Sequence, residues 1–538
     1  MEYAVKNIIF ISGKNPVQKF INKYFISCLL VFFYLAGLIL LFAFYRYQAN
    51  FDTMGYIDSA QKYLAGHWHE AVSAYWSPFF IWLLILPAAA GLEPVLAAKL
   101  LLLLGGGIIL FILRLLLVKF RINRLFSRII LLCMIPVLYY NIFYFSTPEI
   151  YLLIFLMLYV YFLIRNEYDQ KQLYGFLSGI AGGLAFLTQA YALPFFIVHF
   201  SVIHIIFFFR IETYRRRRSL ILNFLFGLAG FILLAGPWIY ILNGKYQKYP
   251  AGSKSEYNIR LAGNGNIHPS ESAGFFAPPD KYSICSWTDP TYLIRLMPES
   301  GILQSAGSFT AFARRLLKNL FRLFMQLAPL TSAVILVYFY KFIINPQKNF
   351  KKTLDPFYLF TVLFFPSGYL LLYIGDERYF WLVNILTMLM GARIVIFLLK
   401  KFRSSLRPAV FAMLLFCLSY LFFPSLLLLS AINAGKKNYN TAMQIRDKLK
   451  ISGITASDIN FEETVKISYY NKCINYGLAA PHWSPDELIT ELKKINIDYY
   501  FVWNENLFFN NKIKILPEIT GGNIPGLKIY AVNKKLLK

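Results

Sequence analysis

Long apolar runs separated by short polar connections fill most of the first 430 residues of the chain. A helix needs roughly 20 apolar residues to cross about 30 Å of hydrocarbon, and about eleven runs approach that length. The expected spans are residues 25–45, 95–118, 129–145, 150–165, 172–189, 191–209, 219–241, 316–340, 356–374, 379–399 and 408–430. This pattern predicts an all-α polytopic membrane protein.

The apolar stretch SPFFIWLLILPAAAGL, residues 77–92, is shorter than these runs and contains Pro87. If it crossed the membrane, the basic loop at 119–124 would lie on the side opposite the N-terminus. If it lies in the interface, every basic loop falls on one side, as the positive-inside rule requires. We therefore expect residues 77–92 to form an interfacial helix.

The charge of the chain agrees with this topology. Lys and Arg total 54 against 27 Asp and Glu, for a formal net charge of +27, although 58% of the residues are hydrophobic and only 15% are charged. Much of the excess falls in the loops placed inside, at 119–128, 210–218, 341–352 and 400–407. Because topology accounts for these cations, we expect membrane lipids and no nucleic acid as partners. The predicted location is the inner (plasma) membrane, with a cytoplasmic N-terminus.

Three regions are then predicted to lie outside, on the periplasmic face. They are the loop 46–94, the long loop 242–315 and the tail 431–538. We expect two domains: a membrane domain of residues 1–430 that carries both loops, and a small extramembrane α/β domain formed by the tail.

The tail differs from the rest of the chain in pattern. Residues 441–449 and 484–495 have helical spacing, and Ser484 lies three residues before Glu487 as in a capping box. Residues 498–504 and 527–532 are rich in aromatic and β-branched residues and are predicted to form strands.

Two carboxylates stand near the expected membrane boundary in FDTMGYIDSAQKYLAG, residues 51–66. Asp52 precedes a helix-like stretch, so one interpretation is an N-cap that accepts hydrogen bonds from first-turn N–H groups. The other interpretation is a catalytic carboxylate. Asp58 is explained by Lys62, which lies four residues further along and pairs with it at the helix surface.

Two more polar positions are expected on the same outer face. Glu149 follows Ser146 with the spacing of a capping box, and a carboxylate at a helix N-terminus stays ionised and available for catalysis. Arg378 belongs to GDERYF, residues 375–380, between two spans. It is suited to bind an anionic group bidentately, and the alternative is a local pair with Asp376 or Glu377.

The remaining candidates are weaker. Gln189 turns between two spans, and Trp76 belongs either to a pocket or to an aromatic belt. The histidine pair His67 and His69 and the five cysteines have no strong metal-ligand spacing, so no cofactor is assigned and a divalent metal stays open.

Acids beside an arginine at headgroup level suit transfer chemistry on a lipid phosphate, because the cation stabilises the leaving phosphate while a carboxylate accepts a proton.

Several of these segments together resemble the membrane-embedded glycosyltransferases of the GT-C fold, in particular protein O-mannosyltransferases and lipid A aminoarabinose transferases. The outer-loop acid and its following positions match Asp52, Tyr56, Ala60, Gly66 and YWSPFFIWLL. The later motifs match TPE with Glu149, GIAGGLAFLTQ at 179–189, and Arg378 with Tyr379. The chain departs from the family at Thr53, Glu149 and Gln189, where relatives have a second acid, an aspartate and a lysine.

This resemblance implies a GT-C-like fold and an inverting transfer of a sugar from a polyprenyl-phosphate donor to a glycan, lipid or protein acceptor. It implies that Asp52 is the base that activates the acceptor hydroxyl and that Glu149 assists it. It further implies donor contacts from Arg378 and Tyr379. The other expected substrate-binding residues are Tyr56, Gln189, Glu377 and Trp76.

Two other functions are compatible with the sequence. An O-antigen-ligase or polymerase-like enzyme would use arginines and histidines of the long loop, which contains Arg260, His268 and Arg295. A lipid-linked sugar transporter or flippase would need paired charges near the bilayer midplane and an internal repeat. The sequence offers Lys99 and Arg114 within one span and no clear repeat.

Overall fold

A computed structural model of the protein describes residues 16–264, 266–299, 309–326, 331–344, 354–371, 377–401 and 407–533. Within these ranges six helices are long and apolar enough to cross a membrane. Large apolar side chains on their outer surfaces are exposed, such as Ile232 and Phe411, each 62% accessible. Side chains of this kind face lipid in a membrane protein, and the chain is a multi-pass membrane protein.

The membrane part follows the order of apolar runs in the sequence. Its first helices are α2 (Pro16–Tyr45), α6 (Pro94–Lys119), α7 (Arg124–Tyr140), α8 (Glu149–Leu163), α9 (Gln172–Thr188), α10 (Ala192–Arg210) and α11 (Tyr214–Tyr246). The later ones are α14 (Phe309–Gln326), α15 (Thr331–Ile344), α17 (Asp355–Phe364), α18 (Trp381–Lys401) and α19 (Arg407–Ser430). Short helices α3 (Phe51–Leu64), α4 (Trp68–Ala71), α5 (Pro78–Ala89), α12 (Lys254–Gly263) and α13 (Pro269–Ser272) belong to the loops.

One predicted span is not a continuous helix. We expected a helix over 356–374, but α17 ends at Phe364 and the short helix η5 (Ser367–Leu371) follows it. Pro366 lies between the two, and a proline in a helix interior removes a hydrogen bond and clashes with the preceding turn. The span expected over 316–340 includes four residues outside the described part of the chain, and on either side of them α14 ends at Gln326 and α15 begins at Thr331. The stretch at 77–92 does form a helix, α5, which has 12 residues and is too short to span the bilayer upright.

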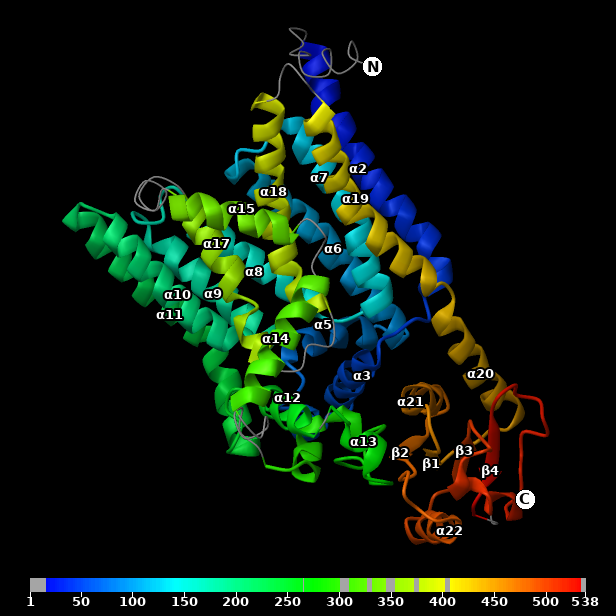
Figure 1. Ribbon diagram of the computed structural model, residues 1–538. Coiled ribbons are helices and arrows are strands. Elements are labelled where there is room, and N and C mark those ends of the chain that lie inside the picture. Colours follow the sequence, from blue (N-terminus) through cyan, green and yellow to red (C-terminus); the bar gives the residue numbers. More distant parts are fainter. Residues whose placement is uncertain are drawn as a thin grey trace.

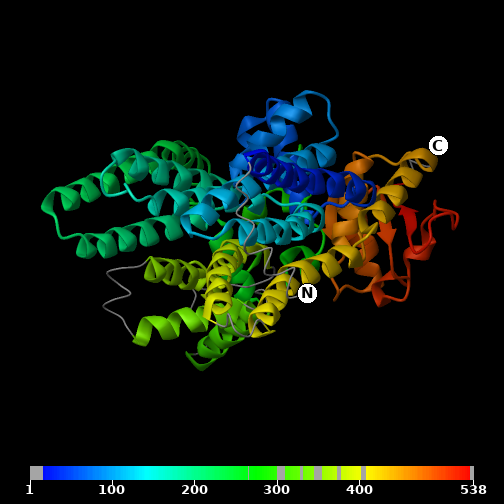
Figure 2. The ribbon, with the colours of Figure 1, turned by 90° about the horizontal axis from the view of Figure 1, so that it is seen from above.

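Close packing of small residues joins α9 to α11. A Cβ atom built on Gly179 would lie 1.9 Å from the carbonyl oxygen of Gly227, and one on Gly175 would lie 2.3 Å from that of Asn223. Only glycine permits backbones to approach so closely, as in other membrane helix pairs. The pair α10 and α11 projects to one side of the molecule, away from the C-terminal sheet (Figures 1 and 2).

The segments that the sequence places outside gather at one end of the molecule. Helices α3, α12 and α13 and the C-terminal sheet lie together, opposite the end where the N-terminal part of α2 and the start of α19 lie (Figure 1). The π-helical turn η1 (Asn141–Phe145) closes α7 at this end. Lys99 of α6 donates to the carbonyls of Ile142 and Phe143 there, at 3.2 and 3.1 Å.

The tail forms a four-stranded sheet in the order β2-β1-β3-β4. The strands are β1 (Ile454–Ser457), β2 (Ile474–Leu478), β3 (Tyr499–Val502) and β4 (Lys528–Ala531); β1 is parallel to β2 and β3, and β4 is antiparallel to β3. The helices are α20 (Ala434–Lys448), α21 (Phe461–Tyr470) and α22 (Pro485–Lys494). The predicted strands β3 and β4 and the capping box of Ser484 with Glu487 are confirmed. The strands β1 and β2 were not predicted.

Candidate functional site

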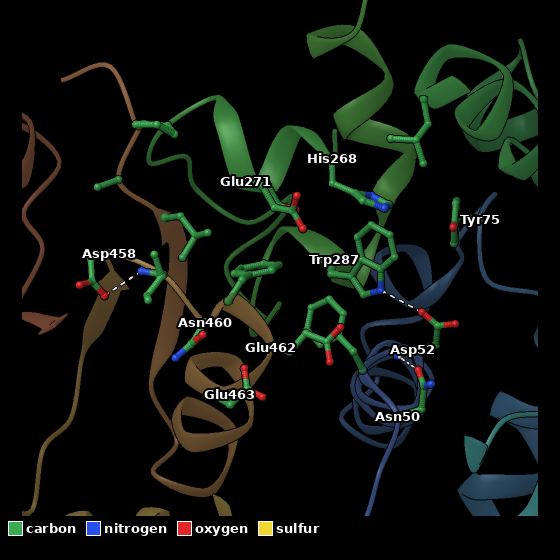
Figure 3. A pocket seen from close by; sticks show the side chains of 18 of the residues that line it. Asn50, Asp52, Tyr75, His268, Glu271, Trp287, Asp458, Asn460, Glu462 and Glu463 are labelled. Carbon is green, nitrogen blue, oxygen red and sulfur yellow. Dashed lines mark hydrogen bonds between the residues drawn. The ribbon is translucent and has the colours of Figure 1, made fainter. Parts of the chain in front are cut away.

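A cavity of about 760 Å³ opens where the outer loops meet the C-terminal sheet and its helices. Its walls come from the first turn of α3, the segment α12–α13, the short helix η2 (Ser286–Thr288) and α21 (Figure 3). The short helix η6 (Glu377–Phe380) contributes as well. Asp52, Arg378 and Tyr379 line it, and these are three of the residues that the sequence predicted as a site.

Asp52 lies in the first turn of α3, one position past its beginning. The N-cap of this helix is Asn50, whose side chain accepts a hydrogen bond from the backbone N–H of Asp52 at 2.9 Å. The N-cap interpretation of Asp52 is therefore wrong. The turn is anchored further by Thr53, whose hydroxyl donates to the carbonyl of Ser146 at 2.8 Å. The Asp52 carboxylate is thus free of backbone capping and points toward the cavity (Figure 3).

Both carboxylate oxygens of Asp52 accept hydrogen bonds from residues far away in the sequence. The guanidinium Nη2 of Arg378 lies 2.7 Å from Oδ2, and the indole Nε1 of Trp287 lies 3.3 Å from Oδ1. The Asp52 side chain is 17% exposed and that of Arg378 is 6% exposed, so the ion pair sits at the cavity surface with its cation buried. Burial raises the pKa of Asp52, but the nearby charges of Arg378 and Lys254 outweigh it and hold the pKa below its usual value.

Arg378 and Tyr379 are carried together on η6. Arg378 also donates to the Tyr379 hydroxyl at 3.2 Å, and the ring of Tyr379 stacks on Tyr369 with centroids 5.4 Å apart. The cation is therefore directed to Asp52. Glu377 is half-buried at the start of η6. Asp376 lies outside the residues that the structure describes.

Gln189 has a partner that the sequence did not suggest. Lys254, the first residue of α12, donates from Nζ to the Gln189 Oε1 at 3.3 Å. The same ammonium lies over the rings of Tyr75 and Tyr379, 5.4 and 5.9 Å from their centroids, and both rings line the cavity. Lys254 is a second cation at the Asp52 side of the cavity. It stands beside the position where the resemblance led us to expect a lysine.

Glu149 and Tyr56 lie behind the cavity wall. Glu149 is the first residue of α8, and its N-cap is Pro148. Ser146 has a left-handed conformation and its hydroxyl donates to the carbonyl of Ile142, so the capping box expected with Glu149 does not form. Glu149 is 4% exposed, and its Oε2 has no hydrogen-bond partner among the residues described. Tyr56 is 2% exposed, and the charge of Glu149 contributes to its raised pKa, after burial.

Asp58 has a structural role, although not at the helix surface as we expected. Its carboxylate lies 3.4 Å from the Lys62 ammonium, and the two side chains are 3% and 2% exposed. Lys62 also pairs with Asp280 of the long loop at 2.9 Å and donates to Ser283 at 2.6 Å. Burial raises the pKa of Asp58 to about 6, and Lys62 opposes that rise. This cluster fixes the long loop on α3.

Two tryptophans hold the wall beside Asp52. Trp76 donates from its indole to the carbonyl of Trp287 at 3.1 Å, and Trp287 in turn donates to Asp52. Gly55 of α3 makes room for this arrangement, because a Cβ there would lie 2.7 Å from the indole Nε1 of Trp76. Trp76 therefore acts through Trp287 and does not itself line the cavity.

Sequence reasoning missed the residues on the opposite side of the cavity. Glu271 of α13 and Asn460, Glu462 and Glu463 at the start of α21 line it, as does Trp287 of η2 (Figure 3). The only signal in the sequence was the placement of their segments on the outer face. His268, named above for a rival function, also lines the cavity.

Within the described ranges no three His, Cys, Asp or Glu side chains come close enough together to hold a metal ion.

The protein is a multi-pass membrane protein of the GT-C fold. Its apolar helices carry an α/β tail at the end where the outer loops lie, and the cavity between loops and tail holds the Asp52–Arg378 pair. The chain is similar in structure to ArnT, the lipid A aminoarabinose transferase of Cupriavidus metallidurans. The structure of ArnT bound to undecaprenyl phosphate matches with a TM-score of 0.55 and 12% sequence identity, over 94% of this chain and 98% of ArnT. The apo form matches with a TM-score of 0.53 and 12% identity, over 95% and 99%. No family model and no curated protein sequence matches the chain.

Proposed function

We propose that the protein is a glycosyltransferase that moves a sugar from a polyprenyl-phosphate donor to an acceptor hydroxyl on the outer face of the membrane. The observation that carries the proposal is the contact of Asp52 with Arg378 in a cavity at the looped end of the helices. It pairs a proton acceptor with a phosphate-binding cation at one point. The binding of undecaprenyl phosphate by ArnT, which shares the fold, supports this donor class.

The donor phosphate occupies the cationic side of the cavity. Arg378 supplies a planar guanidinium, and Lys254 supplies a point charge next to the Tyr75 and Tyr379 rings. Gln189 orients Lys254 through its amide oxygen. The two cations stabilise the negative charge that develops on the leaving phosphate, while the prenyl chain stays in the membrane.

The reaction is a single displacement with inversion at the anomeric carbon. The acceptor hydroxyl oxygen forms the new bond to that carbon, and the carbon–oxygen bond to the phosphate breaks. The phosphate leaves with the electron pair, and the hydroxyl proton passes to the Asp52 carboxylate. A donor phosphate that binds Arg378 also neutralises the charge that lowers the pKa of Asp52, so donor binding strengthens the base.

The other predicted residues assist from behind the wall. Trp76 positions Trp287, which holds the second oxygen of Asp52. Glu149 and Tyr56 are buried behind the cavity wall, where their charge and polarity affect the site. Glu377 begins η6, the turn that carries Arg378 and Tyr379.

The rival functions are less well supported. In the long loop, Arg260 is engaged with Glu256 at 2.6 Å and with the carbonyl of Met297 at 3.2 Å, which is a structural role. Lys99, which suggested transport, is held by backbone carbonyls at the end of α7.

The test uses purified full-length protein in lipid nanodiscs. A panel of radiolabelled undecaprenyl-phosphate hexoses and pentoses is supplied with total cell-envelope extract. The expected result is release of undecaprenyl phosphate together with label in an acceptor fraction, for at least one donor. If no donor in the panel is consumed, the proposed function is wrong. The Asp52→Asn protein serves as the inactive control.

A further inference from the structure

One wall of the cavity is contributed by the C-terminal part of the chain, and this wall is firmly docked. The rings of Phe51 and Phe461 meet edge to face with centroids 5.2 Å apart, and Val465 and Leu478 pack into the same core as the membrane helices. Two backbone hydrogen bonds join the long loop to β2: Phe276 N–H to Tyr476 at 3.0 Å, and Asn475 N–H to Ile284 at 2.7 Å. The C-terminal residues are thus a fixed part of the site.

The cavity is divided in charge. Arg378 lines the side near Asp52, with Lys254 beside it, whereas the opposite side carries Glu271, Glu462 and Glu463. Asn460 adds an amide to that opposite side (Figure 3). The Glu462 side chain is 57% exposed, although Lys466 lies 3.7 Å away. The acidic wall therefore faces the proposed site of the donor phosphate across the cavity.

Structural needs of the fold do not account for all of these acids. Glu462 and Glu463 lie in the first turn of α21, where carboxylates favour the helix dipole. Glu271 comes from α13, a different element, and it faces the same space. Asp458, in contrast, is fully used by its own loop, since it accepts hydrogen bonds from Trp503 and Asn504 backbone N–H groups and holds the turn before α21. Like charges gathered from separate elements into one cavity repel one another, and a ligand with several donors relieves that repulsion.

Carbohydrate hydroxyls are such donors. Carboxylates accept hydrogen bonds from hydroxyls, and an amide both accepts and donates them. The charge-assisted hydrogen bonds to the carboxylates are the stronger ones. Trp287, Phe461 and Phe509 supply the apolar surface that small-molecule sites combine with a few polar groups. A phosphorylated ligand at the acidic wall would instead meet like charges, which oppose binding.

We propose that Glu271, Asn460 and Glu463 form the acceptor subsite, and that the acceptor is a neutral or amine-bearing glycan without phosphate near the reacting hydroxyl. This inference rests on the glycosyl transfer proposed above and names the acceptor class for the same cavity. The donor enters from the membrane side. The acceptor hydroxyl approaches Asp52 from the C-terminal wall.

The experiment uses the full chain in nanodiscs and reads two quantities. The first is the total release of undecaprenyl phosphate from the radiolabelled donor panel, with total cell-envelope extract as the source of acceptor. The second is transfer to three envelope fractions: neutral and amine-bearing glycans, phosphorylated glycolipids, and protein. We expect label in the glycan fraction. Glu271→Gln and Glu463→Gln should each raise the acceptor KM about tenfold, while release of undecaprenyl phosphate at saturating extract persists.

The matched control is Glu491→Gln, because Glu491 pairs with Lys494 at the surface of α22 and does not line the cavity. Size-exclusion profiles and unfolding midpoints establish that each variant is folded. The inference about the acceptor is wrong if no label appears in the glycan fraction, or if the acceptor KM is unchanged in both cavity variants. In either case, release of undecaprenyl phosphate still supports the transferase. Absence of donor release from the unmodified protein overturns the transferase itself.

Discussion

At the scale of residues, Asp52 and Asp58 share one helix but have different environments. Asp58 is enclosed with Lys62, whereas Asp52 faces the cavity and an arginine 326 positions away in sequence. The helical spacing was enough to predict the Asp58–Lys62 pair. It was not enough to predict that Asn50 is the N-cap, because asparagine and aspartate serve almost equally well in that role.

Asp52→Asn should lower sugar transfer by about 100- to 10,000-fold, since an amide accepts no proton from the acceptor hydroxyl. Release and transfer of label from the undecaprenyl-phosphate donor measure the loss. Asp447→Asn is the matched control, because Asp447 pairs with Arg446 at the surface of α20 and does not line the cavity. An Asp52→Asn protein that transfers at the normal rate would reduce Asp52 to a partner of Arg378.

The pH dependence of kcat/KM should report the lowered pKa of Asp52. The carboxylate is the active form, so activity is full above the folded pKa and is lost as pH falls through it. Because Arg378 and Lys254 hold that pKa below the ordinary value of about 3.9, the acid limb should lie below that pH. Lys254→Gln removes one of the two charges and should move the limb to higher pH. An acid limb near pH 6 in the unmodified protein would assign it to another group.

At the scale of elements, the site is a meeting point of segments that the sequence identifies singly. The motif positions on α3 and η6 were predicted as an outer cluster, and they do contact each other. The contribution of α12 was not predicted, because Lys254 is one lysine among many and its value depends on a fold that brings it to the turn between α9 and α10. Local pattern carries no information about such long-range contacts.

An exchange of the side chains at positions 254 and 189 tests the contact of α12 with the turn between α9 and α10. Lys254→Gln should weaken binding of undecaprenyl phosphate by about tenfold or more, because one phosphate-binding charge is lost. Adding Gln189→Lys to that variant should restore most of the affinity, since the ammonium returns to nearly the same place. Binding in nanodiscs measures both. If the double variant binds no better than Lys254→Gln alone, the two positions are not interchangeable and Lys254 acts elsewhere.

Gly55→Ala tests how closely α3 must pack on the loop that follows it. The added methyl group would lie 2.7 Å from the Trp76 indole, so Trp76 must move and its hydrogen bond to Trp287 must lengthen. Overpacking of this kind costs about 1–3 kcal/mol. We expect a lower unfolding midpoint and a lower kcat. The control is Ser59→Ala, because Ser59 lies on the same helix and this change adds no atoms. Gly66→Ala would not serve as a control, because Gly66 has a positive φ.

At the scale of the whole molecule, hydropathy predicted most of the helices and composition separated the tail from them. The exceptions have physical causes. Pro366 follows the end of α17 where a longer helix was expected, β1 has only four residues, and β2 contains Asn475 and Gly477, residue types that are rare in strands. The cavity itself was beyond prediction, because its acidic wall arises only when the tail docks beside α3.

The basic loops predict the orientation of the molecule in the membrane, and direct measurement can test this prediction. The first turn of α11 carries Arg215, and the tail carries Asp486, which is 76% exposed. Positive-inside topology puts Arg215 in the cytoplasm and Asp486 outside. With a membrane-impermeant maleimide, Asp486→Cys should react in intact cells and Arg215→Cys only after permeabilisation. The unmodified chain is the blank, and any labelling of its own cysteines is subtracted: Cys133, Cys285 and Cys473 are buried, and Cys417 is half-buried in α19. The reverse pattern would put Asp52 and its cavity on the cytoplasmic side, where nucleotide-activated sugars are at hand and a lipid-linked donor has no advantage.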